Sequence, residues 1–232
     1  MKRMICLLLL TLLAGCSAPE ADVAESDASE PEAVADVPAL DELYQDAPLP
    51  EEYVGSAVQR SSMVADLAYI PSLEEGLQRA DTIVRASAVG YHHIAPESYD
   101  AVPWTSVTLL VSECLRGDVE AGETVQMYAM EGWSLGTDGV AVYSTLCFGG
   151  LPVQGKEYVL CMSKHTDGEV PDGAFKRLCG RHGMLQIQDD GETLAYAPYE
   201  EPETVRTMTM DEFYGLLGQD TPVDTPVNAG NN

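Results

Sequence analysis

The sequence predicts a mainly β fold, a small closed or partly closed β-barrel with short helices near its ends. Three features of the chain lead to this prediction. Several short segments either alternate apolar with polar residues or are rich in β-branched residues, which is typical of strands. Turns that contain Gly or Asp separate these segments. Signals for helix starts occur only near the two ends of the expected domain.

The individual elements are expected in a simple order. A short helix over residues 72–80 begins with a capping box formed by Ser72 and Glu75. Strands follow over residues 82–89, 104–113, 123–130, 140–145, 156–162, 176–188 and 193–197. A second capping box at residues 209–212 starts a helix that ends at Gly218.

The first sixteen residues predict a leader peptide followed by a lipid anchor. Lys2 and Arg3 form a basic start, and the apolar run over residues 4–13 is too short for a permanent transmembrane helix. The run ends in Leu-Ala-Gly-Cys, which resembles the lipobox of bacterial lipoproteins. That resemblance implies a signal peptide over residues 1–15 and a diacylated thiol on Cys16. A plain secretory signal with an incidental Cys16 is the alternative.

The rest of the chain divides into three parts by composition. Every charged residue over residues 17–52 is acidic, and Ala, Ser and Pro fill the gaps, so we expect residues 16–55 to form a disordered acidic tether. The β-barrel domain is expected over residues 56–218. Residues 219–232 repeat Asp-Thr-Pro-Val and are expected to be a disordered tail.

The charge of the chain limits its partners. The formal net charge is -26, from 38 acidic and 12 basic residues, and this excludes nucleic acid, whose phosphates require basic patches. The same charge opposes adhesion to anionic lipid, so we expect membrane attachment only through diacylglyceryl-Cys16. The protein is therefore expected at the cell membrane, facing outside the cytoplasm, and no cofactor is expected.

A series of short motifs resembles the netrin-like domains, which include the tissue inhibitors of metalloproteinases. The match begins with Ala-Asp-Thr-Ile-Val-Arg-Ala at residues 80–86 and continues with Cys-Leu-Arg-Gly at residues 114–117. Cys147, the segment Gly-Lys-Glu-Tyr-Val-Leu at residues 155–160, and Cys179 follow in the family's order. The resemblance covers about residues 80–188 and implies an OB-like barrel of five strands.

The resemblance does not carry the family's inhibitory activity to this chain. The animal inhibitors chelate a protease's zinc through a free amino-terminal cysteine, whereas Cys16 is expected to carry lipid at the far end of the tether. The family's amino-terminal cysteines also bridge to positions that match Cys147 and Cys179, and this chain has no such partners. We therefore expect a non-enzymatic binding domain on the cell surface that recognises an unknown protein or glycan.

Four cysteines remain in the expected domain, and an exported protein can pair them as disulfides. Four thiols allow three pairings, and the sequence does not choose among them. The alternative is that some are small buried residues on strands. The four are Cys114, Cys147, Cys161 and Cys179.

Two residue patterns suggest an exported hydrolase as an alternative function. Gly-Trp-Ser-Leu-Gly at residues 132–136 matches the nucleophile elbow, with Ser134 as nucleophile and Asp172 and His182 later in the chain. An elbow needs a helix after the serine, and Thr-Asp-Gly at residues 137–139 disfavours one, so we interpret this segment as a glycine-rich hairpin loop.

The second pattern is a candidate zinc site, formed by Cys161, His165, Cys179 and His182. If the predicted strand continues, Cys161 and His165 are about 13 Å apart, so we favour a strand cysteine with loop histidines and no metal.

An envelope-assembly or structural lipoprotein is a third function class.

The aromatic residues near strand ends and loops are the candidates for contact with a partner. Trp133 is the first choice because it falls in the expected glycine-rich loop, and Tyr91 and Tyr143 are the next two. For Trp104 and Tyr128 we favour core filling.

Overall fold

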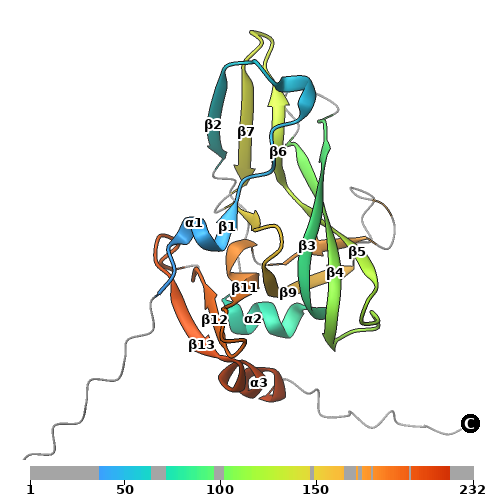
Figure 1. Ribbon diagram of the computed structural model, residues 1–232, viewed down its shortest axis with the longest axis vertical. Helices are drawn as coiled ribbons and strands as arrows, with labels where there is room; N and C mark the ends of the chain where they lie inside the picture. The colour runs from blue at the N-terminus through green and yellow to red at the C-terminus, as the bar shows by residue number, and fades with distance from the viewer. Residues whose placement is uncertain are drawn as a thin grey trace, which may run out of the picture. The chain divides into compact units, whose positions relative to one another are not determined.

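A computed structural model describes residues 37–63, 72–96, 102–146, 149–164, 171, 174–178, 180–198 and 200–219. These residues belong to a unit that spans residues 36–232, and they are mainly β, as the sequence predicts (Figure 1). The expected signal peptide and Cys16, the expected lipid acceptor, lie outside the described residues. No described helix is both long and apolar enough to cross a membrane.

The largest sheet has eight strands in the order β10-β5-β4-β3-β9-β11-β12-β13. Strand β10 pairs in parallel with β5 and also antiparallel with β9. Backbone pairing therefore runs from β9 through β3, β4, β5 and β10 and returns to β9. The strands of this sheet are β3 (Thr82–Ile94), β4 (Trp104–Arg116), β5 (Thr124–Ala129), β9 (Glu157–Lys164), β10 (Phe175–Arg177), β11 (Met184–Ile187), β12 (Thr193–Tyr196) and β13 (Arg206–Thr209).

Two smaller sheets accompany it. Strands β2 (Val58–Met63), β7 (Ala141–Leu146) and β6 (Glu131–Leu135) lie side by side in that order (Figure 1). Strand β2 is parallel to β7, and β6 is antiparallel to β7. Strands β1 (Tyr44–Gln45) and β8 (Leu151–Pro152) form an antiparallel pair.

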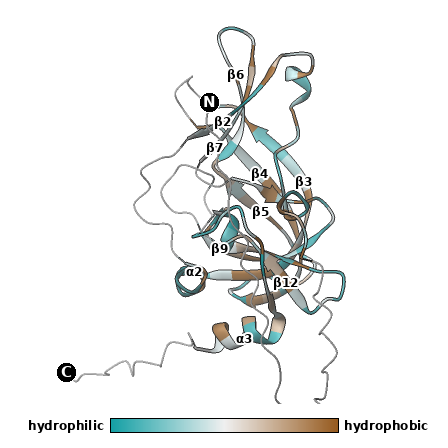
Figure 2. Cartoon of the chain, turned by 90° about the vertical axis from the view of Figure 1, so that its left-hand side faces the viewer, coloured by the Kyte–Doolittle hydropathy of each residue, from teal (hydrophilic) through white to brown (hydrophobic). Residues whose placement is uncertain are grey.

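Both predicted helices are present with their caps. The Ser72 hydroxyl accepts a hydrogen bond from the Glu75 backbone N–H at 3.4 Å, at the start of α2 (Leu73–Arg79). At the start of α3 (Met210–Gln219), Thr209 and Glu212 each bond the other's backbone N–H. Hydrophobic and hydrophilic residues alternate along α3 (Figure 2), and its buried Phe213 joins Leu77 of α2 in a small apolar cluster. The remaining helical segments are α1 (Leu40–Leu43) and the 3-10 turns η1 (Glu51–Tyr53) and η2 (Gly180–Gly183).

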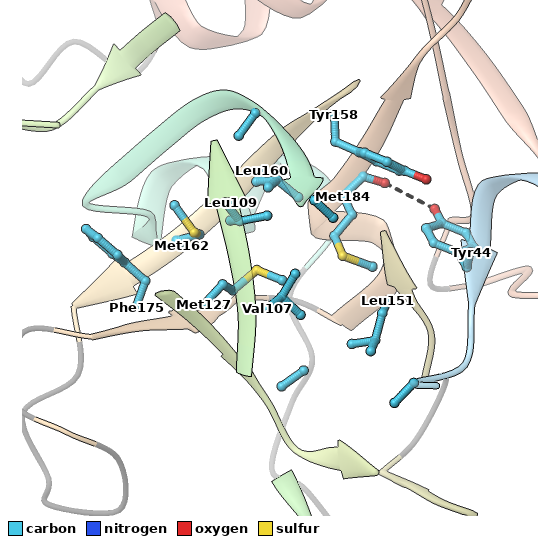
Figure 3. Close-up of a cluster of buried hydrophobic side chains, with 14 of the residues drawn as sticks. Tyr44, Val107, Leu109, Met127, Leu151, Tyr158, Leu160, Met162, Phe175 and Met184 are labelled. Atoms are coloured by element: carbon cyan, nitrogen blue, oxygen red, sulfur yellow. Dashed lines mark hydrogen bonds between the residues drawn. The ribbon is translucent and has the colours of Figure 1, made fainter. Parts of the chain in front are cut away.

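The main hydrophobic core combines residues of the large sheet with residues of the two smaller sheets and of the segment before β2. Alternate residues of β4 and β5 point into it, among them Val107, Leu109 and Met127, and each of these three is 0% exposed. Figure 3 shows these side chains packed against Leu160 and Met184 from β9 and β11. A strand that buries every second residue leaves the others on its outer surface.

Residues 40–53, which we call the N-terminal strap, are part of this core. Leu43 is 0% exposed, and Tyr44 and Tyr53 are also buried. The Tyr158 hydroxyl donates to the Leu43 carbonyl at 2.6 Å, and the Tyr44 hydroxyl donates to the Met184 carbonyl at 3.1 Å (Figure 3). The predicted tether over residues 16–55 and the predicted domain start at residue 56 are therefore wrong for the strap. Its acidic residues are mostly exposed, while four of the residues between and after them, Leu43, Tyr44, Ala47 and Tyr53, are buried. Average composition does not reveal this pattern.

Two further predictions fail at glycines. The long strand expected over residues 176–188 is instead β10, η2 and β11, and Gly180 has a positive φ of 59° that interrupts an extended chain. The segment over residues 132–136, expected as a loop, is mostly strand β6. The turn comes later, where the Gly139 N–H donates to the Gly136 carbonyl at 2.9 Å. The expected tail begins at Gln219, which ends α3, and residues 220–232 lie outside the described residues.

Candidate functional site

Of the three aromatic residues predicted to contact a partner, two are buried in the domain and one is half-buried. Trp133 is 6% exposed on β6, and its indole N–H donates to the Ala47 carbonyl of the strap at 2.8 Å. Tyr143 on β7 is 1% exposed, and its ring lies 5.0 Å from that of Trp133. Tyr91 is half-buried, and its hydroxyl donates to the Pro152 carbonyl. The structure does not support a contact role for the buried Trp133 and Tyr143.

A buried ion pair lies next to Tyr143. Glu131 is 0% exposed and pairs with Arg177 at 2.8 Å. Its carboxylate also accepts hydrogen bonds from the Gly150 N–H at 2.7 Å and the Tyr143 hydroxyl at 3.3 Å. Burial and the nearby Glu131 charge raise the pKa of Tyr143, so its phenol stays protonated. Because removal of one partner from a buried pair is costly, these contacts hold β6 and β7 against the rest of the domain.

The outward surface of β3, β4, β5 and β10 carries the two aromatic residues that we expected in the core. Trp104 and Tyr128 are half-buried, and neither belongs to a hydrophobic core cluster. In the strand register, Ser106 of β4 lies opposite His92 of β3 on one side and opposite Tyr128 of β5 on the other. Tyr128 in turn lies opposite Lys176 of β10. We call this surface the β4–β5 face and define it by Gly90, His92, Ile94, Trp104, Ser106, Thr108, Leu110, Thr124, Gln126, Tyr128 and Lys176.

A ladder of polar side chains crosses the middle of the β4–β5 face. The Ser106 hydroxyl donates to Gln126 Oε1 at 2.6 Å, and Gln126 Nε2 donates to Thr108 Oγ1 at 3.0 Å. These bonds fix the amide of Gln126 between two hydroxyl groups. At one end of the ladder the Lys176 ammonium lies 5.5 Å from the centroid of the Trp104 ring.

The composition of the β4–β5 face differs from that of the chain as a whole. None of its residues is acidic, although the chain carries 38 Asp and Glu residues. Aromatic rings beside oriented hydroxyl and amide groups can stack on a flat apolar surface and bond polar groups at its edge. Sequence reasoning missed this face, although the alternation of Val107, Leu109 and Val111 could have placed Trp104 on the opposite side.

Ser134 does not lie in the geometry that a hydrolase requires. It sits within β6 opposite Val142 of β7, whereas an elbow nucleophile occupies a sharp turn between a strand and a helix. His182 of the same candidate triad is 4% exposed in η2, and Asp172 lies outside the described residues.

The candidate zinc ligands are described only in part. Cys161 is 1% exposed on β9, and His182 lies in η2, whereas His165 and Cys179 lie outside the described residues. Within the part of the chain that the structure describes, no group of three or more His, Cys, Asp or Glu residues is placed to hold a metal ion.

Two of the four cysteines that could form disulfides, Cys114 and Cys161, are in the reduced thiol form. Cys114 is half-buried on β4, and its thiol donates to the Arg116 carbonyl at 3.3 Å instead of forming a disulfide. Cys161 packs in the smaller apolar cluster with Leu77 and Phe213. Cys147, like Cys179, lies outside the described residues.

The chain was compared with known proteins by sequence. No protein-family model matches it, and no curated protein sequence is significantly similar to it.

Proposed function

We propose that the protein is a membrane-anchored, extracytoplasmic lipoprotein whose domain is a non-enzymatic binding module. Its β-rich body is proposed to be an OB-like barrel formed by β3, β4, β5, β9 and β10. The continuous pairing of these five strands supports this, because OB-folds are five-stranded, partly open Greek-key barrels. Strands β9 and β10 are the last two of these five along the chain. In the pairing order β10 lies next to β5 and β9 lies next to β3, an exchange of places that a Greek-key connection produces.

The proposed anchor is the diacylated thiol of Cys16. Because the strap begins at Leu40, the chain available as a flexible tether covers residues 17–39 and not the longer segment that composition alone suggests. A flexible chain of this length has a root-mean-square reach of about 25 Å. The domain would therefore work within a short distance of the membrane surface.

The proposed ligand of the domain is a glycan bound on the β4–β5 face. The observation that carries this is the exposed amide of Gln126, held between the hydroxyls of the buried Ser106 and the half-buried Thr108, beside the rings of Trp104 and Tyr128. Sugars present apolar C–H faces that stack on aromatic rings and hydroxyl groups that bond fixed amides and hydroxyls. The corresponding face of OB-folds, on their second and third strands, binds oligosaccharides in other proteins.

The test is affinity electrophoresis of the full chain in gels that contain soluble cell-wall polysaccharides. Trp104→Ala and Tyr128→Ala should each abolish retardation by any polysaccharide that retards the wild type. The control is Tyr214→Ala, which removes an exposed tyrosine of α3 outside the face. Retardation that survives both face variants, or that is lost equally in the control, would contradict the assignment of the face.

A further inference from the structure

A separate pocket lies between α2, η2 and residues 196–206. Its volume is about 320 Å³, at the lower end of the range for small-ligand sites. The residues that matter for its chemistry are Leu73, Glu74, His182, Tyr196, Glu200 and Arg206. None of them belongs to the β4–β5 face, so an inference from this pocket does not depend on the proposed function.

The charges at the pocket are predominantly negative. Within the described part of the chain, neither Glu74 nor Glu200 forms an ion pair, and both side chains are exposed at the rim. The one lining guanidinium, that of Arg206, pairs with Glu201 at 3.2 Å. The lining therefore carries two carboxylates and one guanidinium that is already paired.

One of the lining residues is aromatic. Tyr196 ends β12 and is half-buried. Both carboxylates line the same pocket as this ring. Burial raises the pKa of its phenol, Arg206 opposes this, and Glu74 and Glu200 raise it further. A neutral phenol ring beside two carboxylates offers a cation both a π-face and negative charge.

We propose that this pocket binds an organic cation that carries a primary ammonium or guanidinium group. The apolar stem of such a ligand would pack against Leu73 and Tyr196, and its charged head would lie between Glu74 and Glu200. A free diamine and a lysine or arginine side chain of a partner protein share this chemistry. Whether the source is free or protein-bound is decided by the arms of the experiment below.

The experiment is isothermal titration calorimetry of the full chain at low ionic strength. One arm uses cadaverine, a second the peptide Gly-Lys-Gly, and a third the same peptide with an acetylated lysine amine. Saturable binding of cadaverine alone supports a free amine, and binding of the lysine peptide supports a protein source. The acetylated peptide should not bind. Absence of saturable binding by both amines up to about 10 mM would overturn the proposal.

The variant Glu74→Gln/Glu200→Gln should weaken the affinity for the bound amine by about tenfold or more. The matched control is Glu51→Gln/Glu120→Gln, which removes the same charge from two exposed sites elsewhere. Because the net charge of -26 attracts cations to the whole surface, this control separates the pocket from the general field. Equal weakening in the two double variants would overturn the proposal, and circular dichroism checks that both are folded.

Discussion

Two regions of this protein each carry one tryptophan and one tyrosine on neighbouring strands. One pair is buried, and the other is half-buried on an outer face. Trp133 and Tyr143, on β6 and β7, lie under the strap, where Ala47 bonds both side chains through its carbonyl and its N–H. Trp104 and Tyr128, on β4 and β5, are half-buried on the same face as the exposed Gln126. An aromatic pair becomes core where another segment supplies both apolar cover and partners for its polar atoms.

Removal of the strap, which covers Trp133 and Tyr143, should cause the largest loss of folding stability. A chain that begins at Ser56, the start that the sequence predicts, lacks the buried Leu43, Tyr44 and Tyr53. Burial of each large apolar side chain contributes about 1.5–3 kcal/mol, so the total loss is comparable with the whole stability of a typical domain. We expect this chain not to fold. A chain that begins at residue 37 should give a cooperative urea transition, and a cooperative transition in the shorter chain as well would contradict a structural role for the strap.

Substitution of one tryptophan from each region tests the difference directly. Trp133→Ala should lower the free energy of unfolding by about 3–5 kcal/mol, because it leaves a cavity and a buried carbonyl without its donor. Trp104→Ala, on the half-buried outer face, should cost about 1 kcal/mol or less. Urea denaturation of both variants measures the two values. Similar losses would mean that Trp104 also serves the core.

The same contrast explains what the sequence predicted and what it did not. Local signals were sufficient for β3, β4, β5, β7, β9 and β12 and for both capped helices, because alternation and capping act between residues close in the chain. The roles of Trp133 and Trp104 were interchanged because burial depends on distant segments. Ala47, the cover of Trp133, is 86 positions away, and no local pattern reports that contact.

A smaller effect is expected from the hydroxyl group of Tyr44, which joins the strap to β11. It donates to the Met184 carbonyl and accepts from the buried Ala197 N–H at 3.1 Å. Tyr44→Phe leaves these groups unpaired while keeping the ring, so we expect a loss of about 1–3 kcal/mol in the free energy of unfolding. Tyr214→Phe, at an exposed site on α3, is the control and should be neutral. An equal, negligible change in both would show that water replaces the Tyr44 hydroxyl.

The smallest expected effect concerns the other end of the strap, where Tyr53 packs edge-on against His93 with ring centroids 5.6 Å apart. Burial lowers the pKa of His93, the nearby Glu52 opposes this, and His92 adds to it. Because the folded pKa lies below the unfolded value of about 6.5, the unfolded chain binds the proton more readily. The contribution of His93 to stability is therefore present above that value and is lost as the pH falls through the folded pKa.

Replacement of the imidazole isolates this contribution from that of the many carboxylates. Between about pH 7.5 and 5, the urea midpoint of the wild type should fall more steeply than that of His93→Gln. Tyr214→Phe, which changes an exposed side chain on α3, should keep the wild-type slope. Parallel pH profiles for the wild type and His93→Gln would mean that protonation of His93 does not affect the stability of the domain. A difference seen only for His93→Gln would instead show that the contact between Tyr53 and His93 depends on pH. This contact lies at the end of the strap, the segment that covers the buried Trp133.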